Sequence, residues 1–313
     1  MGAAFHFADA QAATRGAATV RAVTELRSDA LRATLDRALA SGDARELSAW
    51  LARGSHLPGP RPNLELAQAA GLALAGAGKR GESIVRAYET LDVDDGDPHV
   101  FLPMVAAYAI AARFGGSPRE AAVTLERLGE LAEDERTVVR RAVEDALAMG
   151  VPRFPGGADA LVAALVPWCA GFARGSVALG AVGDRRILDG AHDEAGLVAL
   201  VDTATATLEN APRAKERDPA RRRLLDALPR TLTVAAAASR LVAEWLATRA
   251  ATARNADVRR ALEEVISRLR ARGDRKAERA ATAHALDASA TPPRDPTLLR
   301  PGMRGRGKKR RDR

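Results

Sequence analysis

The sequence predicts an all-α fold, arranged as a solenoid of antiparallel helix pairs, and two observations support this. Residues 139–145 read Val-Arg-Arg-Ala-Val-Glu-Asp, and residues 258–264 repeat the phrase as Val-Arg-Arg-Ala-Leu-Glu-Glu. A weaker copy occupies 220–228, and the offsets of 119, 81 and 38 residues fit a period near 40, which is typical of helical-pair repeats. The composition is 47% apolar but only 4% aromatic, without the sustained β-branched and aromatic runs that strands need.

Length and charge indicate one elongated domain with a basic tail. In a solenoid each repeat buries a face against its neighbours, so 313 residues need no second core. The segment from Thr291 onward carries +7 of the net charge of +8. We therefore expect a poorly ordered N-terminus over 1–16, a helical-repeat domain over 17–288 and a disordered basic tail over 289–313.

The first half of the chain shows helices separated by clear breakers. We expect helices at 17–40, 43–53 and 64–75, then one ending near Leu91 and one over 100–114. Three prolines within 58–62 force a loop, and Asn63 is a natural N-cap for the helix that follows. The 100–114 segment is apolar nearly all round, which indicates burial on more than one side.

Later helices begin at equally clear signals. Ser117, Pro118 and Glu120 form a capping box with proline at the first helical position, so a helix should run from there to about 132. The next helix, 135–149, has one apolar face. Further helices are expected at 158–171, 175–189, 193–210, 219–238, 239–251, 257–272 and 274–287.

The recurring phrase resembles the HEAT family. In that family an acidic residue followed by Val-Arg starts the second helix of each pair, and Asp134 and Asp257 precede Val-Arg here. The segment 57–272 is also similar to bacterial HEAT-repeat proteins that share a Leu-Pro-Gly-Pro-Arg-Pro-Asn-Leu-Glu-Leu-like phrase, present at 57–66. The expected Val-Arg is missing near 177–180, so the repeat there is degenerate. The resemblance implies a curved stack whose concave face binds a partner.

The same resemblance gives the repeated arginines a structural role. The first arginine of such a phrase commonly joins neighbouring repeats through an acidic residue. We therefore expect a repeat ladder made by Asp134, Arg140, Asp257 and Arg259, in preference to ligand contacts.

The motifs that could indicate catalysis or cofactor binding lack the surrounding sequence features that these functions need. Residues 76–81 match G-x-G-x-x-G, but a helix precedes the glycines where a dinucleotide site needs a strand. The histidines are scattered singly, and His192 with Glu194 lacks the downstream cysteines of zinc deaminases. The single cysteine, Cys169, cannot form an internal disulfide and is expected to be buried and inert. We expect no cofactor and no metal.

Two features of the sequence leave a function in nucleic-acid binding or repair as an alternative. Helical-repeat DNA-repair proteins, as the resemblance implies, recognise alkylated bases on a concave surface lined by aromatic side chains and a catalytic aspartate. Trp50, Trp168 and Trp245 are the aromatic candidates, although leucines at helical spacing around Trp50 and Trp245 favour core packing.

The tail is the second feature. It is dense in positive charge and has no aromatic residue to stack on bases, so binding to phosphates should be non-specific. Attraction to anionic lipid and a purely solubilising role are the alternatives. The tail residues are Arg304, Arg306, Lys308, Lys309, Arg310, Arg311 and Arg313.

These observations favour a non-enzymatic scaffold that binds a protein or a polyanion, with the tail adding non-specific nucleic-acid affinity. The alternatives are a helical-repeat glycosylase that repairs alkylated DNA, and an adaptor between proteins. No membrane span or signal peptide is readable, so we expect a cytoplasmic protein.

Overall fold

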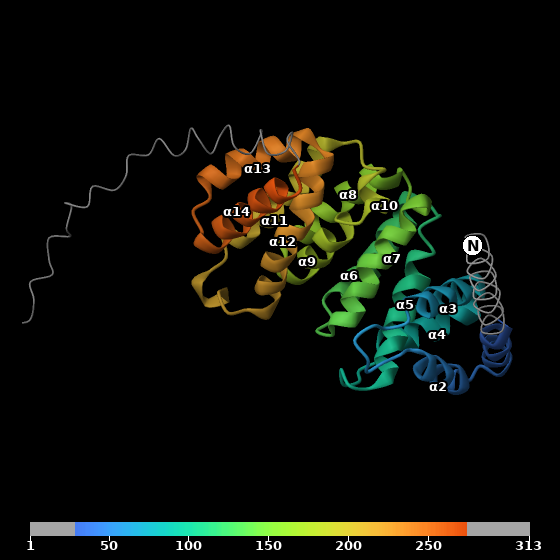
Figure 1. Ribbon diagram of the computed structural model, residues 1–313. Helices are drawn as coiled ribbons and strands as arrows, with labels where there is room; N and C mark the ends of the chain where they lie inside the picture. The colour runs from blue at the N-terminus through green and yellow to red at the C-terminus, as the bar shows by residue number, and fades with distance from the viewer. Residues whose placement is uncertain (1–28, 274–313) are drawn as a thin grey trace, which may run out of the picture.

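The protein is all-helical throughout the part that the computed structural model describes, residues 29–273 (Figure 1). Residues 29–41 are helical, and no strand occurs between 29 and 273. The α-helices that follow are α2 Arg45–Gly54, α3 Leu64–Gly76, α4 Gly78–Glu89, α5 Phe101–Ala111, α6 Pro118–Ala132, α7 Thr137–Gly150, α8 Gly157–Leu165, α9 Phe172–Val182, α10 Arg185–Leu188, α11 Glu194–Glu209, α12 Pro219–Ala238, α13 Arg240–Thr252 and α14 Ala256–Ala271. Short 3-10 helices are η1 Pro98–Val100, η2 Val151–Arg153, η3 Val166–Ala170 and η4 Arg213–Lys215.

Six helices pack in succession and form a row through the molecule. In this row α3 contacts α5, α5 contacts α7, α7 contacts α9, α9 contacts α12 and α12 contacts α14. The remaining long helices pack against members of the row: α4 and α6 against α5, α11 and α13 against α12. The helices follow one another across the molecule in chain order, with α2 to α5 at one end and α12 to α14 at the other (Figure 1).

Helix α5 forms the centre of the N-terminal core. Every residue from Phe101 to Ala111 is buried, because α2, α3, α4, α6 and α7 all contact this helix. The apolar sequence of the segment therefore matches its surroundings, as predicted. Close packing extends to the backbone, since Gly71 of α3 lies against Tyr108 and Ala109 of α5 with no room for a side chain.

The predicted helix starts at Asn63 and Ser117 are confirmed. The Asn63 side chain accepts a hydrogen bond from the Leu66 amide at 3.1 Å. Ser117 and Glu120 form the reciprocal capping box: Ser117 Oγ accepts from the Glu120 amide, and the Glu120 carboxylate accepts from the Ser117 amide at 2.7 Å. Backbone donors that have no partner inside the helix are satisfied in this way.

Two predicted helices are shorter than expected. The 175–189 segment divides at Gly183 because the Asp184 side chain accepts from the Arg186 amide and starts α10 anew. The 158–171 segment leaves the α-helical path at Val166, since Pro167 lacks an amide hydrogen and the chain continues as η3. The expectations for 1–16, the start of the first helix, 274–287 and the tail lie outside the described residues.

The charge of the described part is balanced in total but unevenly distributed. Residues 29–212 carry 18 basic and 26 acidic side chains, whereas residues 213–273 carry 15 basic and 7 acidic ones. The end of the molecule formed by α12 and α14 is therefore strongly basic. None of the described helices has the length and apolar character needed to cross a membrane.

Candidate functional site: an arginine-lined groove

Three adjoining cavities form a groove along the row of helices. Their volumes are about 630, 650 and 430 Å³. The first and second share Arg141 and Glu144, and the second and third share Asp226 and Arg230. The walls come from the loop before α3, the start of α3, α7, α9, the segment before α10, the segment before α12, α12 and α14, so the groove follows the row itself.

Six arginines line the central cavity together with five acidic residues, Glu135, Glu144, Glu216, Asp218 and Asp226. Arg223 and Arg230 are seven residues apart, which is close to two helical turns, so both project from the same face of α12. Arg140 and Arg141 reach the cavity from α7. The full basic set of this cavity is Arg140, Arg141, Arg217, Arg222, Arg223 and Arg230.

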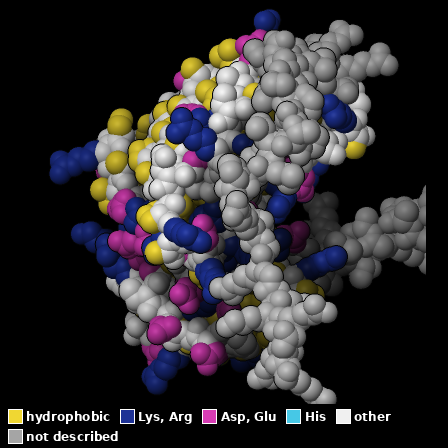
Figure 2. Space-filling view, turned by 90° about the vertical axis from the view of Figure 1, so that its left-hand side faces the viewer, with side chains coloured by type: hydrophobic (Ala, Val, Ile, Leu, Met, Phe, Trp, Pro, Cys, Tyr) yellow, Lys and Arg dark blue, Asp and Glu magenta, His cyan; other side chains and the backbone are white. Residues whose placement is uncertain are grey.

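Most of these arginines form no direct ion pair. Within residues 29–273, no hydrogen bond or ion pair joins an acidic side chain to the guanidinium of Arg141, Arg217, Arg222, Arg223 or Arg230. The Nε atom of Arg223 is buried and has no hydrogen-bond partner in the described part of the chain. In Figure 2, which faces the side where α13 and α14 lie in Figure 1, acidic and basic side chains are intermixed.

Glu144 is the carboxyl group at the junction of the first two cavities. Burial raises the pKa of Glu144 to about 7, and the positive charges of Arg230, Arg141 and Arg140 oppose this shift only in part. Its carboxyl group lies against Gly180 of α9, where a methyl group would overlap the carboxyl carbon. A carboxyl that exchanges its proton near neutral pH is thus held in an open groove.

Arg140 has a structural role at the floor of the groove. Its guanidinium donates to the backbone carbonyls of Asp134 at 2.7 Å and Glu135 at 2.5 Å, and to the Thr137 hydroxyl at 3.0 Å. Burial lowers the pKa of Arg140, and the nearby charge of Arg223 adds to this effect.

The expected repeat ladder has different donors from those we assigned. Arg140 binds the main chain of Asp134, and the carboxylate of Asp134 accepts from Arg136 instead, at 2.6 Å. Arg136 is closer because it follows Asp134 by two residues and donates its own amide to the same carboxylate.

The C-terminal pair departs from the expectation in the same way. Arg259 is exposed and donates to the backbone carbonyl of Ala253, at 2.7 Å. Asp257 accepts from the buried Arg221 of α12 at 3.3 Å, which is a contact between neighbouring copies of the phrase. An arginine-to-aspartate contact therefore joins α12 and α14, with Arg221 as its donor.

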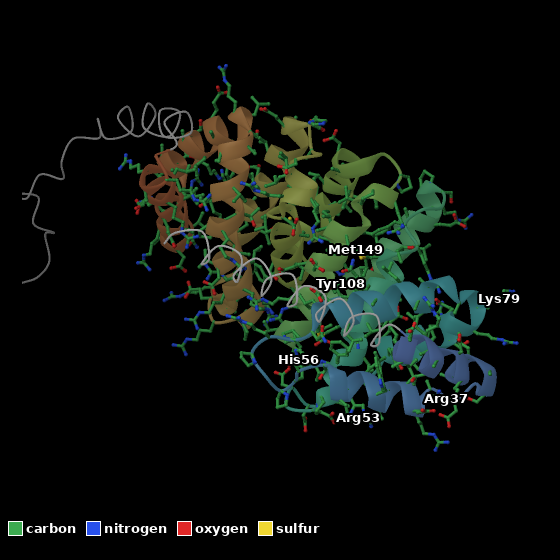
Figure 3. The ribbon with its side chains drawn as sticks, turned by 45° about the vertical axis from the view of Figure 1, so that its right-hand side comes forward. Arg37, Arg53, His56, Lys79, Tyr108 and Met149 are labelled. Carbon is green, nitrogen blue, oxygen red and sulfur yellow. The ribbon has the colours of Figure 1, made fainter. Side chains whose placement is uncertain are left out.

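A network of hydrogen-bonded polar side chains lies at the end of the groove near α10. Tyr108 of α5 donates to Asp145 of α7 at 2.6 Å, and Arg186 of α10 binds both Asp145 and Asp184. Figure 3 labels Tyr108 on α5 and His56 on the loop before α3. His56 also lines the first cavity. Burial raises the pKa of Tyr108, so this phenol stays protonated and serves as a donor.

The tryptophans do not line the groove. Trp168 is buried, and Trp50 and Trp245 pack against the hydrophobic core, as their leucine neighbours predicted. Trp245 also donates to Asp202 at 2.9 Å. Cys169 is buried, and burial raises the pKa of its thiol to about 12, which makes it unreactive. The basic tail residues 304–313 lie outside the described residues.

Sequence reasoning missed Glu144, Arg223 and Arg230 as members of one site. Each stands on a polar position of an amphipathic helix and reads as a solvated charge. The only signal was the weaker copy of the phrase at 220–228, which sets α12 beside the other copies. Within residues 29–273 no group of three His, Cys, Asp or Glu side chains could hold a metal ion. No family model, curated protein or solved structure matches the chain.

Proposed function

We propose that this chain is a HEAT-like α-solenoid and acts as a binding scaffold. The succession of α3, α5, α7, α9, α12 and α14 supports a stack in which each helix pair meets mainly its neighbours. The groove follows this row, as the concave binding face of such a stack would.

The partner that fits this groove is an extended, acidic protein segment. The observation that carries this proposal is the set of arginines in the central cavity that form no direct ion pair with a described acidic side chain. Guanidinium groups bind carboxylates bidentately, and such pairs are stronger than neutral hydrogen bonds. Three cavities in line suit an extended segment better than a compact ligand.

The composition of the groove favours protein over nucleic acid. Among the described residues, no Phe, Trp or Tyr side chain lines any of the three cavities, so bases find no stacking platform there. Carboxylates such as Glu135, Glu216 and Asp226 alternate with the arginines. A polyanion with one charge per nucleotide would meet these carboxylates, whereas a peptide can place its charges selectively.

Peptide binding to the full chain tests this function. A fluorescein-labelled peptide in which glutamate alternates with alanine should bind, and its lysine counterpart should not. The double variant Arg223→Glu, Arg230→Glu should lose affinity by about tenfold or more. Arg119→Glu is the matched control, because Arg119 is an exposed α6 residue that does not line the groove. Equal binding by the double variant would refute the groove as the partner site.

A second candidate function rests on Glu144. A carboxyl with a pKa of about 7 in an open groove can act as a general acid or base at neutral pH. This observation favours the repair enzyme of the helical-repeat type, acting on modified bases. Release of an alkylated base from duplex DNA by the full chain, and its loss in Glu144→Gln, would establish the enzyme over the scaffold.

A further inference from the structure

We infer that the central cavity holds a subsite for one oxyanion group, a carboxylate, phosphate or sulfate, between Arg141, Arg223 and Arg230, and that Glu144 competes with the bound group as an internal anion. This inference rests on the proposed function and adds to it the chemistry of one position in the groove. It also makes binding sensitive to pH.

The positive charges that would hold the oxyanion converge on one place. Arg141 of α7 and Arg230 of α12 both act electrostatically on Glu144, although they come from different helices. Arg223 acts on Arg140, which in turn acts on Glu144. All of these side chains line the same cavity of about 650 Å³. The guanidinium of Arg223 forms no ion pair with a described acidic side chain, so its charge is available to a bound anion.

Glu144 is placed to compete with a bound oxyanion for the same arginines. No hydrogen bond joins its carboxyl group to another described residue, so no donor fixes the ionised form in place. Gly180 gives the carboxyl group the space it occupies. The groups are therefore arranged so that an incoming oxyanion meets both the arginines and a carboxylate that is costly to keep charged.

The charged and titratable groups that line the two cavities together with Glu144 come from several parts of the chain. On α7 and just before it these are Glu135, Arg140, Arg141 and Asp145, and on α12 and just before it they are Glu216, Arg217, Asp218, Arg222, Arg223, Asp226 and Arg230. The loop before α3 and the start of α3 contribute His56, Arg61 and Glu65, and the segment before α10 contributes Asp184. From α9 the cavities are lined by Ser176 and Gly180, which do not titrate.

The sign of the pH dependence follows from like-charge repulsion. A bound oxyanion disfavours ionised Glu144 and therefore favours its protonated form, so binding takes up a proton. Affinity must then rise as pH falls through neutrality, where the free carboxyl loses its charge. A shift of one pKa unit on binding corresponds to about a tenfold change in affinity.

Calorimetric titration of the full chain with sodium sulfate tests the subsite. Sulfate remains a dianion throughout the range from about pH 5.5 to pH 8.5, so any pH dependence belongs to the protein. The wild type should bind about tenfold more tightly at the acid end, with proton uptake. Glu144→Gln should bind equally well at both ends, near the wild-type affinity at acid pH. Arg223→Gln and Arg230→Gln should each weaken binding about tenfold or more.

Controls separate the subsite from general effects. His56→Gln removes the histidine that lines the first cavity and should leave the pH slope unchanged. Arg119→Gln should bind like the wild type. Sulfate should also compete with the glutamate peptide for the wild-type chain. A slope that persists in Glu144→Gln, or sulfate and peptide binding independently, overturns the inference.

Failure of the subsite and failure of the scaffold proposal give different results. If sulfate does not bind while the peptide still binds and depends on Arg223 and Arg230, the subsite is refuted and the groove function stands. If the peptide itself fails to bind, the proposed function is refuted.

Discussion

Glu144 shows how one side chain depends on a residue far away in sequence. In the sequence it follows Val143 on an amphipathic helix and reads as a surface charge, so no local pattern distinguishes it. Gly180, 36 residues later in the sequence, sets the environment of Glu144, because the Glu144 carboxyl group packs against this glycine. Burial of this kind arises from tertiary packing, and a single sequence does not encode which helices meet.

The raised pKa of Glu144 predicts a loss of stability with rising pH. The native state holds the proton up to about pH 7, whereas the unfolded chain releases it near its ordinary value of 4.5. Between these values the native state binds more protons, so the free energy of unfolding falls as pH rises. The free energy of unfolding of the wild type should fall by about 3 kcal/mol across this range, and Glu144→Gln should remove this loss. Urea unfolding of both proteins at acid and alkaline pH measures it, and parallel pH profiles would contradict it.

Gly71 offers a second prediction at this scale. A Cβ atom there would lie 2.6 Å from Tyr108 Cβ and 2.8 Å from both the Ala109 amide nitrogen and the Val105 carbonyl oxygen. Two of these atoms belong to the backbone and cannot move aside, so Gly71→Ala should lower the free energy of unfolding by about 2 kcal/mol.

The control for this change lies on the same helix. Gly76 has open space around its Cβ position, so Gly76→Ala should leave the stability unchanged or raise it by up to about 1 kcal/mol. Urea denaturation measures both variants, and equal effects would show that helix propensity, not the α3 to α5 contact, decides the outcome.

At the scale of elements, local signals predicted most of the helices. The capping box at Ser117, the cap at Asn63 and the apolar run that became α5 each act within a few residues, so the sequence alone contains them. The divisions at Gly183 and Pro167 were missed because their apolar neighbours continue the helical period across the break. Periodicity reports the buried face and not the end of the helix.

The capping box at the start of α6 has a measurable contribution. Ser117→Ala removes the acceptor of the Glu120 amide and should lower the free energy of unfolding by about 1 kcal/mol. Ser83→Ala is the matched control, because Ser83 is an exposed serine inside α4 whose hydroxyl donates only to the Lys79 carbonyl, at 3.4 Å. Chemical denaturation of the two variants should separate them, and equal midpoints would refute the contribution.

At the scale of the whole molecule, the groove could not be foreseen. Its arginines come mainly from two helices about 80 residues apart, and their lack of direct ion pairs depends on how α7 and α12 meet α9. The sequence did identify the related phrases, but the resemblance assigned their arginines to a ladder. Arg140 and Arg221 do serve the architecture, and Arg140 lines the groove together with residues that follow each of them.

The tail predicts a separate, salt-dependent affinity for duplex DNA. Its six positive charges between Arg304 and Arg311 should give a slope of about −5 in the logarithm of affinity against the logarithm of salt concentration. A chain ending at Ala290 should lose this binding. Fluorescence anisotropy with a labelled duplex at several salt concentrations measures the salt slope of the full chain and the affinity that the shortened chain retains. Undiminished binding by the shortened chain would place nucleic acid in the groove and contradict the protein partner.

The uneven distribution of charge makes the described part an electric dipole without net charge. Residues 29–212 have an excess of 8 negative charges and residues 213–273 an excess of 8 positive charges. Such a molecule orients in the field of a neighbour, and two copies attract when the basic end of one faces the acidic end of the other. At 0.1 M salt the screening length is about 10 Å, which confines this attraction to near contact. Dilute buffers will therefore promote head-to-tail association, and physiological salt will suppress it.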